Sequence, residues 1–253
     1  MQQDKDEQLF IKRINELTAA AYYRHIITYT DFLNLNEISI FHSIKKDLPK
    51  IPYESYGGYE GAERQVLFFK GNKDDIVFKD YISCVHIEPA SKRFSDELTH
   101  RDFLGSILGL GLDRSTIGDI LVNDKEAYCF CLSNISDFIV NNLFLVKHTN
   151  VLCSITNTDA SVFKPIFQEI KGTITSNRLD AIIAVALKTS RSKITSLISS
   201  GRVFINGREI LSNSYIVKDN DIISVRGHGK FVYKGEEGQT RKGRIRILLL
   251  KYS

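Results

Sequence analysis

The sequence predicts an α+β protein with three domains in one chain, and three patterns lead to this prediction. Apolar residues recur at helical spacing in residues 1–75, and strand-like and helix-like segments alternate over residues 76–160. Two short helices followed by strands are expected in residues 178–253, and residues 161–177 are interpreted as a linker. A chain of 253 residues, of which 43% are hydrophobic, is long enough to build several cores.

The predicted N-terminal domain is small, helical or mixed, with helices as its main elements. An amphipathic helix is expected over residues 4–27, with an apolar stripe that consists of Phe10, Ile14, Leu17 and Ala21. A second helical segment ends before Pro49, and a short strand is expected over residues 66–69.

The first helix ends in Tyr22-Tyr23-Arg24-His25, which has two interpretations. Side chains of these types can stack on RNA bases. They can also be partly buried contacts of a small helical domain, and this is the interpretation we adopt. The sequence alone leaves both open.

The middle domain is predicted from the order of its elements. From residue 82 onward the segments follow the order strand, helix, strand, strand, helix, strand, and Asn123-Asp124 supplies the turn between the paired central strands. This order is that of a split-βαβ, ferredoxin-like sandwich, also called an α/β plait. The fold hosts RNA binders and many other proteins, so it does not indicate a function by itself.

His100-Arg101-Asp102 has the letters of a protein-kinase catalytic loop. The other kinase motifs are missing from the sequence: it has no glycine-rich phosphate loop, no Val-Ala-Ile-Lys and no Asp-Phe-Gly. Thr99 and Asp102 instead have the spacing of a capping box, so we expect Asp102 to start a helix.

In the C-terminal domain, residues 179–187 predict one helix, and a second follows Thr189-Ser190 and ends at Gly201. A strand over residues 203–205 precedes Asn206-Gly207, which is the dipeptide favoured in two-residue hairpin turns. Later glycines alternate with cations up to a closing strand, and this predicts a basic hairpin that includes Arg226 and Lys230.

Positive charge is concentrated in this C-terminal domain. From residue 178 to the end there are 15 Lys+Arg against 6 Asp+Glu, a net charge of +9, whereas residues 1–177 carry a net charge of −5. The exposed positions expected on the second helix are hydroxyls and cations without a carboxylate; they are Ser190, Arg191, Ser192, Lys193, Thr195 and Ser196. Solvated faces usually mix both signs, so this composition favours binding to a phosphate backbone.

The remaining composition excludes several classes of protein. The four cysteines form neither a disulfide framework nor a zinc motif, so we expect buried free thiols and no metal or cofactor. No apolar run approaches the roughly 20 residues that span a bilayer. The acidic, polar N-terminus is unlike a signal peptide, which predicts a reducing, cytoplasmic location.

The C-terminal motifs resemble the S-four (S4) RNA-binding domain. The matching residues are Arg178-Leu179-Asp180, Ser190-Arg191, Lys193, Leu197-Ile198, Gly201, Val203, Ile205-Asn206-Gly207 and residues 221–225. The resemblance implies that the basic helix and the following turn grip structured RNA. The RNA-binding residues that we predict are Arg178, Ser190, Arg191, Lys193, Arg202, Asn206 and Gly207, together with Arg226 and Lys230 of the hairpin.

Three further segments extend the resemblance to nearly the whole chain. They are residues 57–64, 103–111 and 117–120, and with the S4 motifs the chain resembles the YlmH family of bacterial S4-domain proteins. The resemblance implies an α/β-plait RNA-binding domain before the S4 domain and a link to cell division. It also implies a role in ribosome-associated quality control, with rRNA, tRNA and the large ribosomal subunit as partners. We expect a monomer.

Two classes of function remain. The first is a non-catalytic binder that holds an rRNA or tRNA helix in one conformation, and this is the function we predict. The second is an rRNA-modifying enzyme, of pseudouridine synthase or methyltransferase type, that finds its substrate with the S4 domain. Pseudouridine synthases share the letters Arg-Leu-Asp, but here Ala-Ile-Ile-Ala follows Asp180 in place of the Thr-Ser-Gly run, and no methyl-donor glycine loop is evident.

Overall fold

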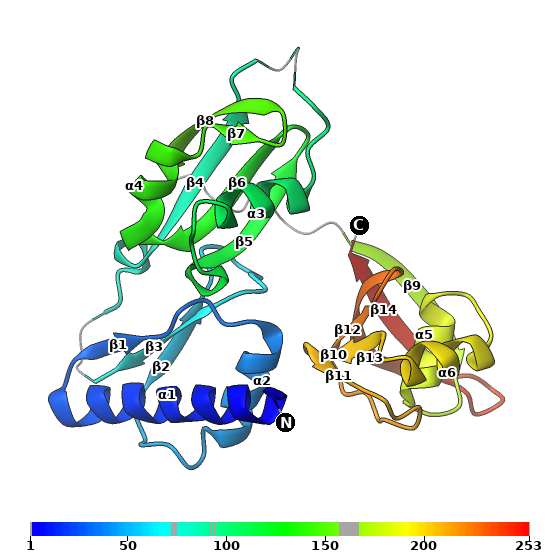
Figure 1. Ribbon diagram of the computed structural model, residues 1–253. Coiled ribbons are helices and arrows are strands. Elements are labelled where there is room, and N and C mark those ends of the chain that lie inside the picture. The colour runs from blue at the N-terminus through cyan, green and yellow to red at the C-terminus, as the bar shows by residue number, and fades with distance from the viewer. Residues whose placement is uncertain (1, 72–74, 92, 94, 157–166, 253) are drawn as a thin grey trace. The chain divides into compact units, whose positions relative to one another are not determined.

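The computed structural model describes residues 2–71, 75–91, 93, 95–156 and 167–252 (Figure 1). The chain forms two compact units, unit 1 over Met1–Lys164 and unit 2 over Pro165–Ser253. Unit 1 contains the N-terminal and middle domains of the sequence prediction, and unit 2 contains the C-terminal domain. Within the described residues, no helix combines the length and apolar character that a membrane crossing needs.

The N-terminal part of unit 1 is mixed rather than mainly helical. Two helices, α1 (Gln2–Arg24) and α2 (Leu35–Ile44), pack on a three-stranded sheet of order β1-β3-β2. The strands are β1 (Ile27–Tyr29), β2 (Tyr53–Tyr56) and β3 (Val66–Lys70). The sequence predicted both helices and the central strand β3, whose first four residues are all buried. It missed the two edge strands, because each is too short to show an alternating pattern.

The middle part of unit 1 has the expected ferredoxin-like order. Its elements are β4 (Ile82–Pro89), α3 (His100–Leu108), β5 (Ile117–Asn123), β6 (Glu126–Leu132), α4 (Ser133–Asn142), β7 (Leu145–Val146) and β8 (Thr149–Thr156), with short 3₁₀ turns at Phe78–Asp80 and Arg114–Thr116. The strands are antiparallel in the order β5-β6-β4-β8-β7, so the first and third strands are central. Both helices cover one face of this sheet (Figure 1).

The capping role expected for Asp102 is confirmed. Its carboxylate accepts hydrogen bonds from the backbone N–H and the hydroxyl of Thr99, at 2.8 and 2.7 Å. The bond to the Thr99 hydroxyl is the main cause of the lowered pKa of Asp102. Asp102 is therefore the N3 residue of a capping box at the start of α3. This structural role explains the letters His-Arg-Asp without a kinase catalytic loop.

A polar network joins the N-terminal and middle parts of unit 1; we call it the Arg64–Asp119 joint. The carboxylate of Asp119 accepts hydrogen bonds from the Tyr59 hydroxyl (2.8 Å) and from the backbone N–H groups of Glu63 (2.7 Å) and Arg64 (3.2 Å). The Arg64 guanidinium donates to three backbone carbonyl groups, those of Phe32 (2.6 Å), Ile117 (2.9 Å) and Arg114 (3.3 Å). A shared apolar cluster packs behind this network, with Phe68 from β3 and Phe130 from β6. The joint makes the two predicted domains one compact unit.

Unit 2 places two helices on one face of a six-stranded antiparallel sheet (Figure 1). The elements are β9 (Phe167–Ile174), α5 (Leu179–Ala186), α6 (Arg191–Ser199), β10 (Val203–Ile205), β11 (Arg208–Glu209), β12 (Ile222–Val225), β13 (Gly229–Gln239) and β14 (Ile245–Tyr252). The sheet order is β11-β10-β12-β13-β14-β9. The predicted hairpin is present as the antiparallel pair β13 and β14, with Lys230 on β13, but Arg226 lies outside it, in the turn between β12 and β13.

The linker predicted over residues 161–177 is wrong from residue 167 onward, where β9 pairs with β14 along its whole length. Residues 161–166 lie outside the described residues. The alternating signal of β9 is weak, because Gly172 interrupts the inward-facing positions between Ile170 and Ile174. This glycine lets the strand approach α5, since a Cβ atom there would lie 2.4 Å from a methyl group of Val185.

The four cysteines are free thiols, as expected. Burial raises the pKa of Cys84 and of Cys131 to about 12 and that of Cys153 to about 11. Burial also raises the pKa of Cys129. Since the thiolate is the reactive form, these side chains are packing residues.

Candidate nucleic-acid interface

Helix α6 is held on unit 2 by its apolar face and presents its polar face to solvent. Ile194 and Ile198 are fully buried in the core of the unit. Arg191, Ser192, Lys193 and Ser196 are exposed. The helical period therefore separates a packing face from a face of cations and hydroxyls, as the sequence predicted.

The first turn of α6 leaves backbone N–H groups for a ligand. Ser190 has the extended conformation of an N-cap residue, but its hydroxyl lies 3.0 Å from that of Ser192 and caps no backbone N–H of the described residues. The first turn contains no acidic residue. Free N–H groups and the positive end of the helix dipole attract an anion, and the exposed side chain of Lys193 adds a charge beside them.

A buried carboxylate beneath this surface holds two of the predicted arginines. Asp180 accepts hydrogen bonds from Nε and Nη2 of Arg178, at 3.2 and 3.1 Å, and from Nη2 of Arg191, at 2.7 Å. Its side chain is 6% exposed, whereas those of Arg178 and Arg191 are 37% and 51% exposed. We call these three residues the Asp180 clamp. The exposed positions of α6 carry no carboxylate, as expected; the acid of this clamp comes from α5 and is buried behind the arginines.

The clamp fixes the guanidinium groups and keeps a positive charge. Two arginines on one carboxylate leave a net charge of +1, and each guanidinium has five N–H donors, of which the clamp uses one or two. Burial by itself would raise the pKa of Asp180, but the hydrogen bonds and charges of Arg178 and Arg191 outweigh it, and the pKa is lowered. The carboxylate is therefore ionised at neutral pH.

The Asp180→Asn variant is expected to be less stable than the wild type by at least about 1 kcal/mol at pH 7, because the charge-assisted hydrogen bonds are lost. The pKa of Asp180 is lower in the folded protein than in the unfolded chain, where it is about 3.9. The ionised carboxylate therefore stabilises the fold fully above a pH of about 3.9, and this stabilisation is lost as the pH falls through the pKa of the folded state. The stability difference between the two proteins should shrink as the pH falls below about 4. Urea unfolding of both proteins across this range measures it, and a difference that persists undiminished in acid contradicts the clamp.

Arg202 and Arg226 form a second basic group at the other end of α6. The backbone N–H of Arg226 donates to the carbonyl oxygen of Arg202 (2.9 Å), and the Arg226 guanidinium lies 4.7 Å from the ring centroid of Phe204. Both arginines are exposed. The Glu209 carboxylate is close to Gly201 at this end, so the surface without exposed acids is confined to the N-terminal part of α6.

Asn206 and Gly207 have a structural role in the turn between β10 and β11. Both have positive φ angles, of 48° and 79°, as a two-residue hairpin turn requires. The Asn206 side chain donates to Asp221 (2.8 Å) and accepts from the backbone N–H of Ile222 (2.9 Å). The predicted RNA contact at Asn206 thus competes with bonds that fix the turn, and the exposed Gly207 offers only backbone groups.

Lys230 lies on β13, opposite Ser224 of β12. Its ammonium lies 5.6 Å from the ring centroid of Tyr252 on the neighbouring strand β14. The structure therefore divides the nine predicted residues among the start of α6, the end of α6, the β10–β11 turn and β13. Sequence reasoning missed the contacts of Asp180, Phe204 and Tyr252, since each depends on a partner that is brought close only by the fold.

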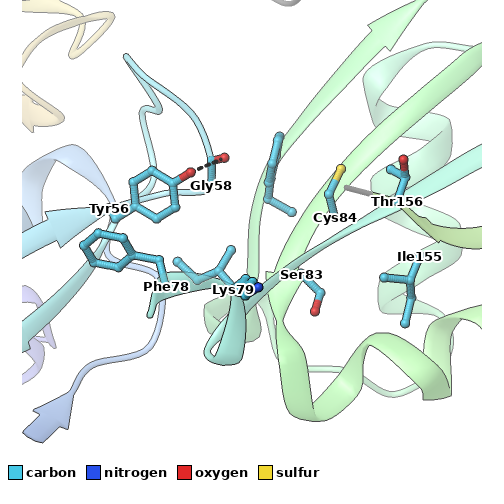
Figure 2. Close-up of a pocket in the computed structure, with 10 residues that line it drawn as sticks. Tyr56, Gly58, Phe78, Lys79, Ser83, Cys84, Ile155 and Thr156 are labelled. Carbon is cyan, nitrogen blue, oxygen red and sulfur yellow. Dashed lines mark hydrogen bonds between the residues drawn. The ribbon is translucent and has the colours of Figure 1, made fainter. Parts of the chain in front are cut away.

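Unit 1 contains a cavity of about 200 Å³ beside the sheet of its middle part (Figure 2). Tyr56 and Phe78 line one side and stack on each other with ring centroids 4.5 Å apart. Figure 2 shows the Tyr56 hydroxyl donating to the carbonyl oxygen of Gly58, at 2.7 Å. Cys84 also lines the cavity, but its raised pKa keeps the thiol protonated, so this side chain offers no nucleophile there.

Among the described residues, one group has the composition of a metal site. Ligand atoms of His86, Glu88 and Glu126 lie within 4.8 Å of one another. His86 Nε2 is 2.7 Å from the Glu126 carboxylate, and its ring stacks on Tyr128 at 4.5 Å. These contacts account for the arrangement without an ion, and the expectation that no metal or cofactor binds stays a prediction.

Comparisons with known proteins agree with this organisation. A family model described as "Putative RNA-binding domain in YlmH" matches residues 78–160, and the S4 domain model matches residues 177–223. The chain is thus an RNA-binding protein of the S4-domain class. "Ribosome-associated protein quality control protein P2" of Bacillus subtilis (strain 168) is 29% identical over 251 residues, which cover 96% of this chain and 94% of that protein. The chain therefore carries both domains in this order and is similar to this relative over nearly its whole length.

A solved structure shares part of the fold. It is that of "Cell division protein ylmH from Streptococcus pneumoniae", with a TM-score of 0.51 and 18% sequence identity. The similarity covers 60% of this chain and 91% of that chain. At this identity the likeness concerns the fold alone.

Proposed function

We propose that the protein binds structured rRNA and tRNA on the large ribosomal subunit through unit 2, without catalysing a reaction. The observation that carries this proposal is the start of α6, where exposed Arg191 and Lys193 stand beside uncapped backbone N–H groups. The S4 and YlmH domain matches support binding to RNA, and the name of the Bacillus relative supports a ribosomal location.

Basic groups at both ends of α6 suit a folded RNA. A helix of nine residues is about 14 Å long, so Arg191 and Arg202 can contact phosphates on different parts of one RNA element. The Asp180 clamp holds Arg178 and Arg191 in place before binding, which reduces the ordering cost of association. Phosphate contacts of this kind set the register of the RNA, and hydroxyl groups such as that of Ser190 can add hydrogen bonds.

The structure of Asp180 disfavours the enzymatic alternative. A catalytic aspartate has to reach its substrate, whereas both oxygens of Asp180 are bonded to arginines and the side chain is nearly buried. The letters Arg178-Leu179-Asp180 therefore have a structural explanation in this chain. Binding energy alone, without a covalent step, is the mechanism that the geometry supports best.

In this proposal the protein is a cytoplasmic monomer that acts in ribosome-associated quality control. The name of the Bacillus relative refers to that process, and the relative aligns over nearly the whole chain. The link to cell division is named only in the description of the Streptococcus structure.

Cosedimentation with purified ribosomal subunits tests the proposal. The full-length protein is expected to pellet with the large subunit, to be released as salt is raised, and to leave the rRNA unmodified. Pelleting only with the small subunit, or no pelleting at low salt, would contradict the ribosomal assignment. Pseudouridine or new methyl groups in rRNA after incubation with the purified protein, with a methyl donor supplied where needed, would favour the enzyme.

A further inference from the structure

The end of α1 exposes two tyrosines that a purely structural role would bury. Tyr23 is 77% exposed and Tyr22 is 47% exposed, with ring centroids 5.1 Å apart in an edge-to-face arrangement. Arg24 and His25 are also exposed. The expectation that these four residues are partly buried contacts is wrong. Adjacent exposed aromatic and cationic side chains are instead typical of surfaces that bind unpaired nucleotides.

A hollow of about 690 Å³ lies beside these tyrosines, and we call it the tyrosine hollow. Its described lining residues carry no carboxylate; they are Tyr22, Tyr23, His25, Lys50, Ile51, Pro52, Lys70 and Gly71. Lys70 is paired with Glu54 at 3.2 Å and Asp75 at 3.6 Å, so it adds little net charge. Lys50, which lines the hollow, and Arg24, which follows Tyr23 at the end of α1 and is not a lining residue, are exposed and have no ion pair with a described residue.

The backbone around the tyrosine hollow is fixed before any ligand arrives. The Gly71 N–H donates to the carbonyl oxygen of Ile26 (3.1 Å), and a Cβ atom on Gly71 would lie 1.9 Å from the carbonyl oxygen of Ala21. The Thr28 hydroxyl donates to the carbonyl oxygen of Leu17 (2.9 Å). His25 has a φ of 54°, in the left-handed region where glycine is usually preferred. A residue with a side chain at this position makes the backbone conformation less favourable than glycine would.

We propose that the tyrosine hollow is a second RNA contact, which stacks one or two unpaired bases on Tyr22 and Tyr23 while Arg24 and Lys50 contact the flanking phosphates. The proposal concerns unit 1 and does not rest on the assignment of α6 in unit 2. Aromatic rings accept any base, so this contact adds affinity without sequence preference. An RNA strand fits better than a protein partner, because Lys50 lines the hollow without an ion pair to a described residue and none of the described lining residues is acidic.

The sequence contains no tryptophan, which allows a direct test with the full-length protein. In the Tyr23→Trp variant the single indole reports on stacking, and a short single-stranded oligoadenylate is expected to quench its fluorescence. The matched control is Phe144→Trp, at an aromatic position that is 64% exposed elsewhere in unit 1. Its fluorescence should stay unchanged. Alanine at both Tyr22 and Tyr23 should weaken binding of the oligonucleotide about tenfold, and Phe144→Ala should leave it unaltered.

Combining Tyr23→Trp with Arg191→Ala and Lys193→Ala separates this contact from unit 2. Quenching by the oligoadenylate that persists in the combined variant supports an independent site in unit 1. Quenching that disappears shows that unit 2 holds the oligonucleotide and overturns the proposal. An indole that is not quenched at saturating oligoadenylate, while a structured RNA still binds, also overturns it and leaves a protein partner as the use of the exposed rings.

Discussion

Alanine at both Arg191 and Lys193 is expected to weaken binding of structured RNA about tenfold or more and to reduce the salt dependence. Each side chain that neutralises a phosphate releases a counterion, so the slope of log K against log salt should become shallower by about one to two units. Filter binding or fluorescence anisotropy at several salt concentrations measures both effects. Lys193→Ala alone should lower the slope by about one unit, and it leaves the Asp180 clamp intact.

A matched control removes the same charges from another surface. Lys12 and Arg13 are an adjacent Lys and Arg on α1, and both pair with Glu16 at the surface. Alanine at both should leave the salt slope nearly unchanged, since these side chains lie outside the proposed interface and neutralise no phosphate there. Arg191→Ala also removes one arm of the clamp, so an unfolding curve has to show that unit 2 remains folded. Equal slopes for the folded double variant and the wild type would refute the assignment of α6.

The Asp119→Ala variant is expected to destabilise unit 1 by about 3 kcal/mol. Its carboxylate accepts three hydrogen bonds, from the Tyr59 hydroxyl and from the N–H groups of Glu63 and Arg64. Each donor left without a partner costs about 1–3 kcal/mol where water cannot replace the acceptor, and less where it can. Urea unfolding should show an earlier transition for unit 1 and an unchanged one for unit 2.

The control for this variant is Asp137→Ala, at an exposed position of α4. A surface substitution of this type should change stability by less than about 0.5 kcal/mol. If Asp119→Ala proved no more harmful than Asp137→Ala, the polar joint would not be what holds the two parts of unit 1 together.

The sequence was most informative where local chemistry decides the structure. Ser190 and Gly201 bracket α6, Asn206-Gly207 makes the predicted turn, and Thr99 with Asp102 starts α3. In each case the interacting residues lie within a few positions of one another. These signals were sufficient to place the exposed face of α6, which carries Arg191 and Lys193 of the candidate interface.

What the sequence did not reveal depends on partners that are distant along the chain. Strand β9 is recognisable mainly through its pairing with β14, and the bond from Arg191 to Asp180 crosses from one helix to another. Residues 57–64 and 117–120 supported the family resemblance, but their shared role in the Arg64–Asp119 joint appears only in three dimensions. The exposure of Tyr22 and Tyr23 also depends on tertiary structure, because it is decided by which other segments pack against the end of α1.

Crosslinking of RNA to the full-length protein in living cells tests the central claim most directly. Sequencing of the bound RNA is expected to give rRNA together with tRNA, and the crosslinked peptides of unit 2 should include the start of α6 around Arg191 and Lys193. Recovery of mRNA alone, of no RNA, or of crosslinks that avoid unit 2 altogether would contradict the account.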